Sequence, residues 1–219
     1  MTNIEKKIDG IKWLPWIGIK YFSCPPKYKL LIVGESHYHD NSSESIEKHN
    51  KESFTQEVVQ DLAVNRNYYN TKMFKNLHLA LCDHDDFQSD KLWELISFYN
   101  FIQRPMVTNK ERPSKEDHLK AWAVFFELID KLKPAKVLFI GVEASNYLSL
   151  YRRDIKVTKE TKIGTTSPRS AKIDVAYQED PLELYFIKHT SQYFSSEKWH
   201  QYLLEKLGGF IRWITPQVS

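Results

Sequence analysis

The chain has 219 residues and a formal net charge of +3, and its composition is 42% hydrophobic, 14% aromatic and 27% charged. An intrinsically disordered protein has few aromatic residues and a high net charge, so this composition excludes that class. The longest apolar runs, such as residues 30–33 and 137–140, are far shorter than the roughly 20 residues that a membrane-spanning helix needs. The first residues lack the apolar segment of a signal peptide. We therefore expect a cytoplasmic protein with no membrane partner.

Cysteine content limits the kinds of metal centre. The only cysteines are Cys24 and Cys82, which are too few for a four-thiolate iron–sulfur cluster, and we expect both to be reduced thiols rather than a disulfide. His78 and Cys82 stand four residues apart on a predicted helix, followed by His84 and Asp85, and these residue types can bind zinc. We favour the simpler interpretation of a surface imidazole and a buried thiol. We predict no metal and no other cofactor.

The predicted elements alternate between strands and helices along the chain. Continuous apolar runs, typical of parallel strands covered on both faces, occupy residues 29–33, 97–102, 137–140 and 182–187. Helical spacing of apolar residues occupies residues 55–65, 72–81 and 197–207, together with a helix that Ser114 caps and Pro134 ends. This order predicts a three-layer α/β/α sandwich with a central, mostly parallel four-stranded sheet. We expect one domain over residues 1–219, with residues 1–27 packed on it as an N-terminal arm.

Polar residues follow each predicted strand, and the carboxyl ends of parallel strands are where ligands bind. The four segments are residues 34–39, 100–105, 141–145 and 189–193. In the last segment, Tyr193 and Phe194 are either anchors for the following helix or an exposed aromatic wedge. Residues 152–172 carry seven basic and two acidic side chains, which favours either phosphate binding or a solvated surface loop.

Taken together, these segments resemble motifs of the uracil-DNA glycosylase superfamily. Residues 31–39 read LIVGESHYH, similar to a water-activating motif that is Gly-Gln-Asp-Pro-Tyr-His in one branch and Gly-Glu-Ala-Pro-Gly in another. Residues 98–105 resemble the strand that carries the base-reading Asn and a basic–Pro pair. Residues 132–144 are similar to the third strand and its phosphate-binding turn, and His189-Thr190-Ser191 is similar to a His-Pro-Ser motif. The likeness covers roughly residues 28–205, with all four motifs in the family's order.

The resemblance implies a set of site residues. Those implied for catalysis are Glu35, Ser36, Asn100 and His189. Those implied for substrate binding are Gly34, His37, Tyr38, Phe54 and again Asn100. Those implied for DNA binding are Arg104, Gly141, Ser145, Arg169, Ser191, Gln192 and Tyr193. In this scheme Glu35 orients a water or stabilises the sugar cation, His189 donates a hydrogen bond to the leaving base, and Asn100 reads a pyrimidine edge.

The chain departs from the family's pattern in the first motif. Ser36 replaces the water-orienting Asp of one branch, and His37 replaces the motif Pro. Tyr38 matches the residue that blocks bases with a C5 substituent in that branch. Glu35 matches the second branch, which often carries an iron–sulfur cluster that this chain has too few cysteines to bind. The expected function is therefore that of a metal-independent DNA glycosylase, a monomer that flips a modified or deaminated pyrimidine out of DNA and leaves an abasic site. Substituted cytosines of phage DNA are candidate substrates beside uracil, which would give an anti-phage defence role.

Two other functions fit the same residues. The chain can be a catalytically silent DNA-binding module of the same fold, because the motif Asp is lost. Gly34-Glu35-Ser36 also resembles the Gly-Asp-Ser block of small α/β esterases, with Ser36 as nucleophile and His189 as base. Those enzymes place the base in an Asp-x-x-His block, which this chain lacks before His189, so we rank the esterase lowest.

Overall fold

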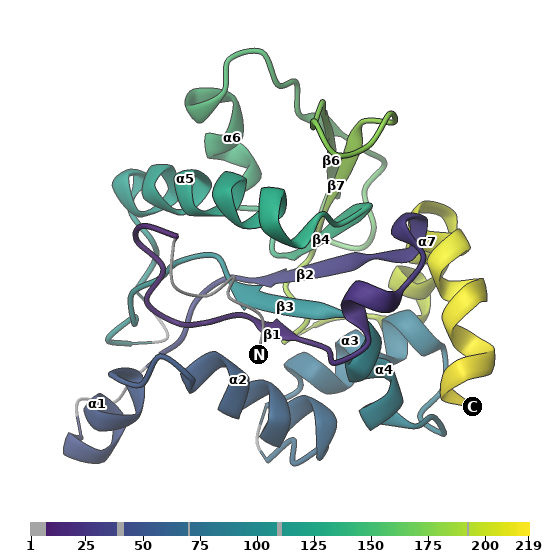
Figure 1. Cartoon of the computed structure of the whole chain (residues 1–219), viewed down its shortest axis with the longest axis horizontal. Helices are drawn as coiled ribbons and strands as arrows, with labels where there is room; N and C mark the ends of the chain where they lie inside the picture. Colours follow the sequence, from purple (N-terminus) through teal and green to yellow (C-terminus); the bar gives the residue numbers. More distant parts are fainter. Residues whose placement is uncertain (1–7, 39–41, 70, 109–110, 192) are drawn as a thin grey trace.

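The computed structural model describes residues 8–38, 42–69, 71–108, 111–191 and 193–219, and its centre is one β-sheet (Figure 1). Among these residues the sheet has seven strands in the order β1-β3-β2-β4-β7-β6-β5. Their bounds are Trp16–Ile17 for β1, Leu30–Gly34 for β2, Ser97–Asn100 for β3, Lys136–Ile140 for β4, Thr158–Lys159 for β5, Arg169–Ile173 for β6 and Leu182–Ile187 for β7.

The prediction of a four-stranded sheet is wrong, although the four predicted strands all form. β3, β2, β4 and β7 are parallel neighbours and make up the centre of the sheet. β1 pairs with β3 on one side, and β6 and β5 extend the sheet beyond β7, all in antiparallel pairing. Parallel strands that are buried on both faces need continuous apolar runs, whereas short or one-sided antiparallel strands do not. Only the four central strands are therefore recognisable from the sequence.

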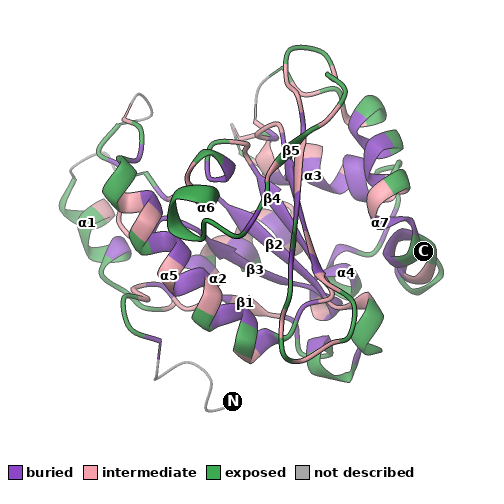
Figure 2. Ribbon diagram, turned by 90° about the horizontal axis from the view of Figure 1, so that it is seen from above, coloured by how far each residue is buried: buried purple, intermediate pink, exposed green. Residues whose placement is uncertain are grey.

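Helices cover both faces of the sheet, as the α/β prediction requires (Figures 1 and 2). On one face lie α2 (Phe54–Val59), the π-helical turn η4 (Gln60–Val64), α3 (Met73–Cys82), α4 (Ser89–Leu95) and α7 (Ser196–Val218). On the other lie α5 (Lys115–Leu132) and α6 (Ser145–Tyr151). The short helices are α1 (Ser43–His49), η2 (Tyr21–Ser23) and η3 (Pro26–Tyr28). We call the first side the α3/α7 face and the second the α5 face.

The segment before β2 contacts the end of α1 and pairs with the edge of the sheet. Trp13 is fully buried and its Nε1 donates a hydrogen bond to the carbonyl of His49 over 2.9 Å. Further along, Trp16 and Ile17 pair with Phe98 and Ser97 of β3. The described part of the N-terminal segment thus supports both the edge of the sheet and the end of α1.

Both cysteines are free thiols, as expected, and Cys24 is buried. Among the described residues, no helix is long and apolar enough to cross a membrane.

Helix α5 begins and ends where the sequence predicts. The Ser114 hydroxyl accepts a hydrogen bond from the Asp117 N–H, and the Asp117 carboxylate accepts one from the Ser114 N–H, which completes a capping box. At the other end Lys133 adopts a left-handed conformation (φ 49°) directly before Pro134. These caps satisfy backbone groups that would otherwise lack partners.

We predict that Ser114→Ala lowers the free energy of unfolding by about 1 kcal/mol, because the first turn of α5 loses its side-chain acceptor. Ser195→Ala is the matched control, since Ser195 caps α7 without a side-chain hydrogen bond. Urea denaturation of the two variants measures the difference. Equal losses in both would show that the Ser114 cap contributes nothing specific.

Candidate active site

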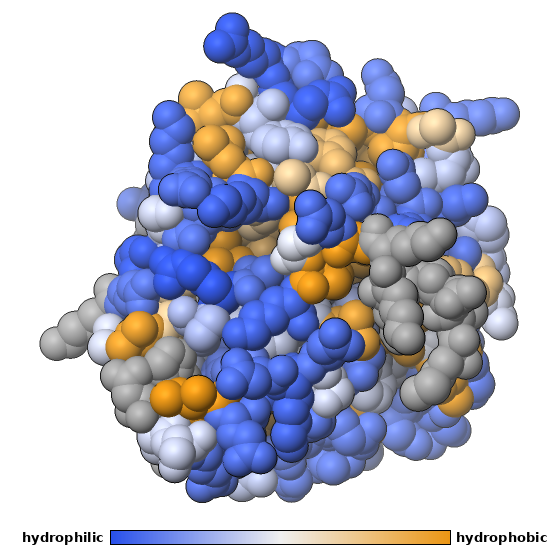
Figure 3. Space-filling model, turned by 60° about the vertical axis from the view of Figure 1, so that its left-hand side comes forward, coloured by the Kyte–Doolittle hydropathy of each residue, from blue (hydrophilic) through white to orange (hydrophobic). Residues whose placement is uncertain are grey.

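The carboxyl ends of the four parallel strands bring the predicted segments to one edge of the sheet. Gly34 of β2 is paired with Asn100 of β3, and Ile140 of β4 with Ile187 of β7. Glu35, Gly141 and the loop after β7 therefore follow adjacent strands at the same edge. Figure 3 views the molecule with the side of these strand ends turned forward, and on this face apolar side chains gather around a hollow among hydrophilic ones.

The side chain of Asn100 lies over Gly34. A Cβ at Gly34 would collide with the Asn100 Oδ1 and would come within 2.8 Å of the Phe98 ring, so only glycine leaves room for this arrangement. Asn100 is 5% exposed, and its side-chain amide has no hydrogen-bond partner among the described residues. Buried amides are normally hydrogen-bonded, so an amide without a protein partner at a strand end is available to a ligand.

Glu35 continues the chain from Gly34 and is half-buried. The Tyr38 hydroxyl lies 3.4 Å from the Glu35 Oε2, as donor to the carboxylate. Burial raises the pKa of Tyr38, and the negative charge of Glu35 raises it further. The phenol therefore stays protonated at neutral pH. Glu35 also lines a small pocket together with Gly141.

His189 is held by its own loop. Its Nδ1 lies 3.3 Å from the backbone nitrogen of Ser191 and 2.9 Å from the Ser191 hydroxyl oxygen. Because a backbone N–H can only donate, Nδ1 accepts, and the proton of the neutral ring is on Nε2. Asn76 of α3 holds the loop by donating to the carbonyls of Thr190 at 2.6 Å and Ser191 at 3.2 Å.

The pKa of His189 depends on its burial and on two charged side chains. Burial lowers the pKa of His189, the negative charge of Glu35 acts in the opposite direction, and the positive charge of Arg112 lowers it further. The imidazole is therefore neutral at pH 7, with an Nε2–H available to donate. Glu35 and His189 are thus electrostatic neighbours.

Arg112 is a residue that the sequence analysis missed. Its positive charge lowers the pKa of both His189 and Tyr38, and its guanidinium donates to the Glu111 carbonyl at 2.9 Å. The available signal was that Arg112-Pro113 is a second basic–Pro pair after β3, following Arg104-Pro105.

Two arginines predicted to bind DNA have partners inside the protein. Arg104 makes a bidentate ion pair with Asp117 and a further one with Glu111, each at 2.7 Å. Arg169 donates to the Val142 carbonyl at 3.0 Å and to the Ser145 hydroxyl at 2.6 Å. These contacts give Arg104, Arg169 and the buried Ser145 structural roles, and the arrangement offers no support for their predicted phosphate contacts.

His37 and the hydroxyl of Ser36, both in the first motif, are buried in the protein. His37 is buried, its Nε2 lies 2.9 Å from the Thr55 hydroxyl, and its ring centroid lies 4.5 Å from that of Phe54. Phe54 also packs against His49 and Trp13. The predicted base-stacking residue Phe54 is thus part of a buried aromatic cluster. Its ring contacts in the described part of the chain are with Trp13, His37 and His49. Ser36 has a buried hydroxyl and no hydrogen bond to His189.

The structure separates the two aromatic residues after His189. Tyr193 is 92% exposed and has a left-handed backbone (φ 51°), whereas Phe194 stacks on Trp199 of α7 with ring centroids 5.7 Å apart. Phe194 is therefore the anchor and Tyr193 the exposed aromatic side chain. Gln192, predicted to bind DNA, lies outside the described residues.

The basic segment reaches this loop. Lys188 donates to the Tyr193 carbonyl at 2.7 Å and lies 3.3 Å from the Thr165 hydroxyl, which belongs to the turn between β5 and β6. The tip of that hairpin, within residues 152–172, therefore lies beside the exposed Tyr193.

The suspected metal residues do not form a site. His78 is fully buried, and its Nδ1 lies 2.9 Å from the Tyr68 hydroxyl while its Nε2 accepts from the Trp93 indole at 2.9 Å. Both ring nitrogens are used in the core, so the expectation of a surface imidazole is wrong. In the described part of the chain no group of three or more His, Cys, Asp or Glu side chains is placed to bind a metal.

A scan against protein-family models gives no match for this chain, and a search among curated proteins gives none either. The function therefore has to be inferred from the geometry of the site.

We predict that the protein loses stability as pH falls below about 6.5. Burial lowers the pKa of His37 to about 3, and the charge of His49 contributes in the same direction. The ordinary pKa of histidine, about 6.5, applies to the unfolded chain, which therefore binds the proton first. The stability contributed by neutral His37 is present above pH 6.5 and is lost between about pH 6.5 and 3, with a slope of at most about 1.4 kcal/mol per pH unit.

Urea denaturation at several pH values between 7.5 and 4.5 tests this. His37→Gln should weaken the pH dependence, whereas His84→Gln, at an exposed histidine, should leave it unchanged. An unaltered slope in His37→Gln would contradict the assignment.

Proposed function

We propose that the protein is a DNA glycosylase that hydrolyses the N-glycosidic bond of a flipped-out modified or deaminated pyrimidine and leaves an abasic site. We also propose that its four parallel strands correspond to those of the uracil-DNA glycosylase superfamily. The observation that carries both proposals is that Glu35, Asn100 and His189 lie at the carboxyl ends of three of the four parallel strands, β2, β3 and β7. The side-chain amide of Asn100 has no hydrogen bond to another described residue, and it is therefore available to a ligand.

Each of these groups supplies one requirement of the reaction. The bond between C1′ and the base nitrogen breaks with its electron pair leaving on the base, so positive charge develops on the sugar and negative charge on a base oxygen. The Glu35 carboxylate stabilises the sugar cation and orients water, whose oxygen bonds to C1′. The His189 Nε2–H donates a hydrogen bond to the base oxygen. The Asn100 amide, with one donor and one acceptor, reads the pyrimidine edge.

Tyr38 supports the inclusion of enlarged bases. It corresponds to the residue that blocks C5 substituents in one branch of the family, but here its side chain is 40% exposed and its hydroxyl is turned to Glu35. Ser36 and His37 also replace the motif residues that set the size of the pocket in that family. We therefore include cytosines substituted at C5, such as those of phage DNA, among the substrates, and with them a defence role.

The rival functions receive less support. An esterase needs a hydrogen bond from its nucleophile to its base, but Ser36 makes none to His189, and the His189 Nδ1 is bonded to Ser191. A silent DNA-binding module remains the second candidate, because Ser36 stands in place of the motif Asp.

We expect the wild-type protein to release base from at least one member of a panel of oligonucleotides that contain uracil, oxidised pyrimidines or substituted cytosines. Abasic sites are detected by strand cleavage in alkali. Glu35→Gln and Asn100→Ala should each lower the rate by a factor on the order of 100 or more, because each removes a group that contacts the reacting nucleotide. Glu116→Gln, at an exposed position on α5, is the matched control. DNA binding without release from any substrate would favour the silent module.

We further expect Tyr193→Ala to act on duplex DNA more than on single strands. An exposed aromatic side chain at the rim can fill the space that a flipped base leaves, and flipping out of a duplex costs a few kcal/mol. The rate on duplex substrate should fall on the order of 10-fold, with a smaller change on the same single strand. Tyr69→Ala, at another exposed tyrosine (75%), serves as the control. Equal losses on both substrates would rule out a wedge.

A further inference from the structure

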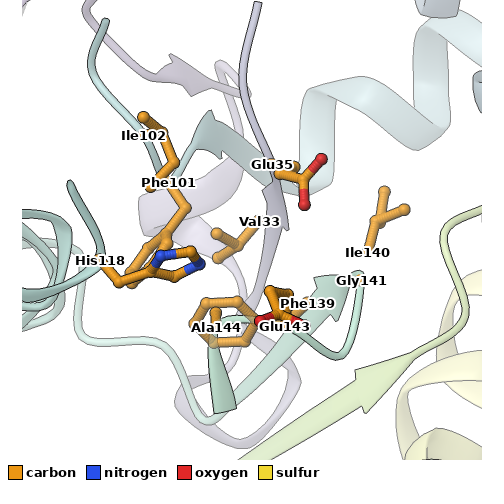
Figure 4. A pocket seen from close by; sticks show the side chains of 11 residues that line it. Val33, Glu35, Phe101, Ile102, His118, Phe139, Ile140, Gly141, Glu143 and Ala144 are labelled. Atoms are coloured by element: carbon orange, nitrogen blue, oxygen red, sulfur yellow. The ribbon is translucent and has the colours of Figure 1, made fainter. Parts of the chain in front are cut away.

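The pocket that Glu35 lines also contains a buried histidine from α5 that no motif predicted. It opens between the ends of β2 and β4 and the first turn of α5, with Glu35 on one side and His118 on the other (Figure 4). Its volume is about 10 Å³, which is the room that a single water molecule needs. Most of the remaining wall is apolar, with Val33, Phe101 and Phe139 among the lining residues.

His118 is held with one nitrogen directed to this pocket. It is 1% exposed, and its ring stacks on Tyr147 of α6 with centroids 4.2 Å apart and planes inclined by 23°. Its Nδ1 lies 2.8 Å from the carbonyl oxygen of Ser114. Because a carbonyl can only accept, Nδ1–H donates to it, and in the neutral form of the ring this leaves the lone pair on Nε2. Within the described part of the chain, Nε2 has no hydrogen-bond partner.

Hydrogen-bond acceptors line the pocket on more than one side, because Glu143, in the turn after β4, lines it together with Glu35 and His118. The Glu35 carboxylate and the His118 Nε2 both accept, so they suit a small ligand with two O–H donors, and the volume limits that ligand to water. Water is also what the glycosylase reaction consumes. A water that donates to both groups has its oxygen lone pairs directed away from them.

We propose that His118 is a positioning residue that holds the attacking water together with Glu35. The proposal rests on the glycosylase function proposed above. In the reaction, the water oxygen bonds to C1′ while the bond from C1′ to the base breaks and its electron pair leaves with the base. One proton of the water passes to the Glu35 carboxylate, and the other stays on the new sugar hydroxyl, hydrogen-bonded to His118.

A role of His118 that is limited to stacking on Tyr147 makes different predictions, whereas the Nδ1 bond to Ser114 is distinguished by the ordered water described below. If His118 only stacks on Tyr147, an aromatic replacement preserves its function and a non-aromatic one does not. If it accepts a hydrogen bond from water, His118→Phe loses that acceptor, whereas His118→Gln keeps one in its side-chain carbonyl. If His118 only stacks, His118→Phe should therefore be the more active variant. If His118 accepts a hydrogen bond from water, His118→Gln should be the more active one.

The experiment compares these variants with His200→Phe and His200→Gln. His200 is the matched control, because it is buried, its Nδ1 lies 3.0 Å from the Ala80 carbonyl, and it belongs to α7 outside the pocket. On the substrate found with the wild type, His118→Phe should lower kcat about 10- to 100-fold with KM unchanged, the size of one hydrogen bond to a reacting group. His118→Gln should retain most of the activity, and both His200 variants should be near the wild type.

Two results would overturn the proposal. One is a kcat of His118→Phe equal to that of His200→Phe, or a larger loss in His118→Gln than in His118→Phe. The other needs no substrate: a high-resolution crystal structure of the wild type should contain one ordered water bonded to the Glu35 carboxylate and the His118 Nε2, and its absence refutes the site even if a variant fails to fold. Failure of the wild type to release any base refutes the proposed function instead, so the two failures are distinguishable.

Discussion

The parallel pairing of Gly34 with Asn100 is the constraint on which the candidate site depends. Because side chains alternate between the two faces of a sheet, a register shift of one residue would turn Asn100 to the opposite face and would separate it from Gly34. The pairing also requires that β2 end in a residue without a Cβ, since any side chain there would occupy the place of the Asn100 amide. Glu35 then follows directly. The chemistry proposed for this edge of the sheet is therefore a consequence of how two strands are aligned.

The central fold and the location of the site were predictable because both depend on local patterns. Four apolar runs identify the buried parallel strands, and the rule that ligands bind beyond the carboxyl ends of such strands selects the segments that carry Glu35, Asn100 and His189. The outer strands were not predictable in the same way. β6 has an irregular burial pattern, and β1 is two residues long, so each exists only because a neighbouring strand offers a partner.

The roles of charged side chains were the least predictable, because a charge in the sequence does not reveal its partner. Arg104 and Arg169 have the residue type and position of phosphate-binding groups, yet carboxylates, carbonyls and a hydroxyl of the same chain bind them. Arg112, on a loop that no pattern singled out, also donates to a carbonyl of the chain, and its positive charge lowers the pKa of His189. His118 was missed for a related reason: on the helical periodicity of α5 it is one more buried residue, and only the position of α5 above β2 and β4 brings it to the pocket.

The residues of the candidate site lie on two sides of the sheet. Asn100 lies over Gly34 beside Phe98, which packs on the α3/α7 face, and the His189 loop is held from the same side by Asn76 of α3. Glu35 and His118 line a pocket on the opposite side, and most of its apolar wall belongs to the α5 face. A nucleotide placed across the strand ends would have its base among the first group and its C1′ next to the second. In the proposed reaction, a water that approaches the sugar from the side opposite the departing base would come from the α5 face, and the parallel strands provide the two sides.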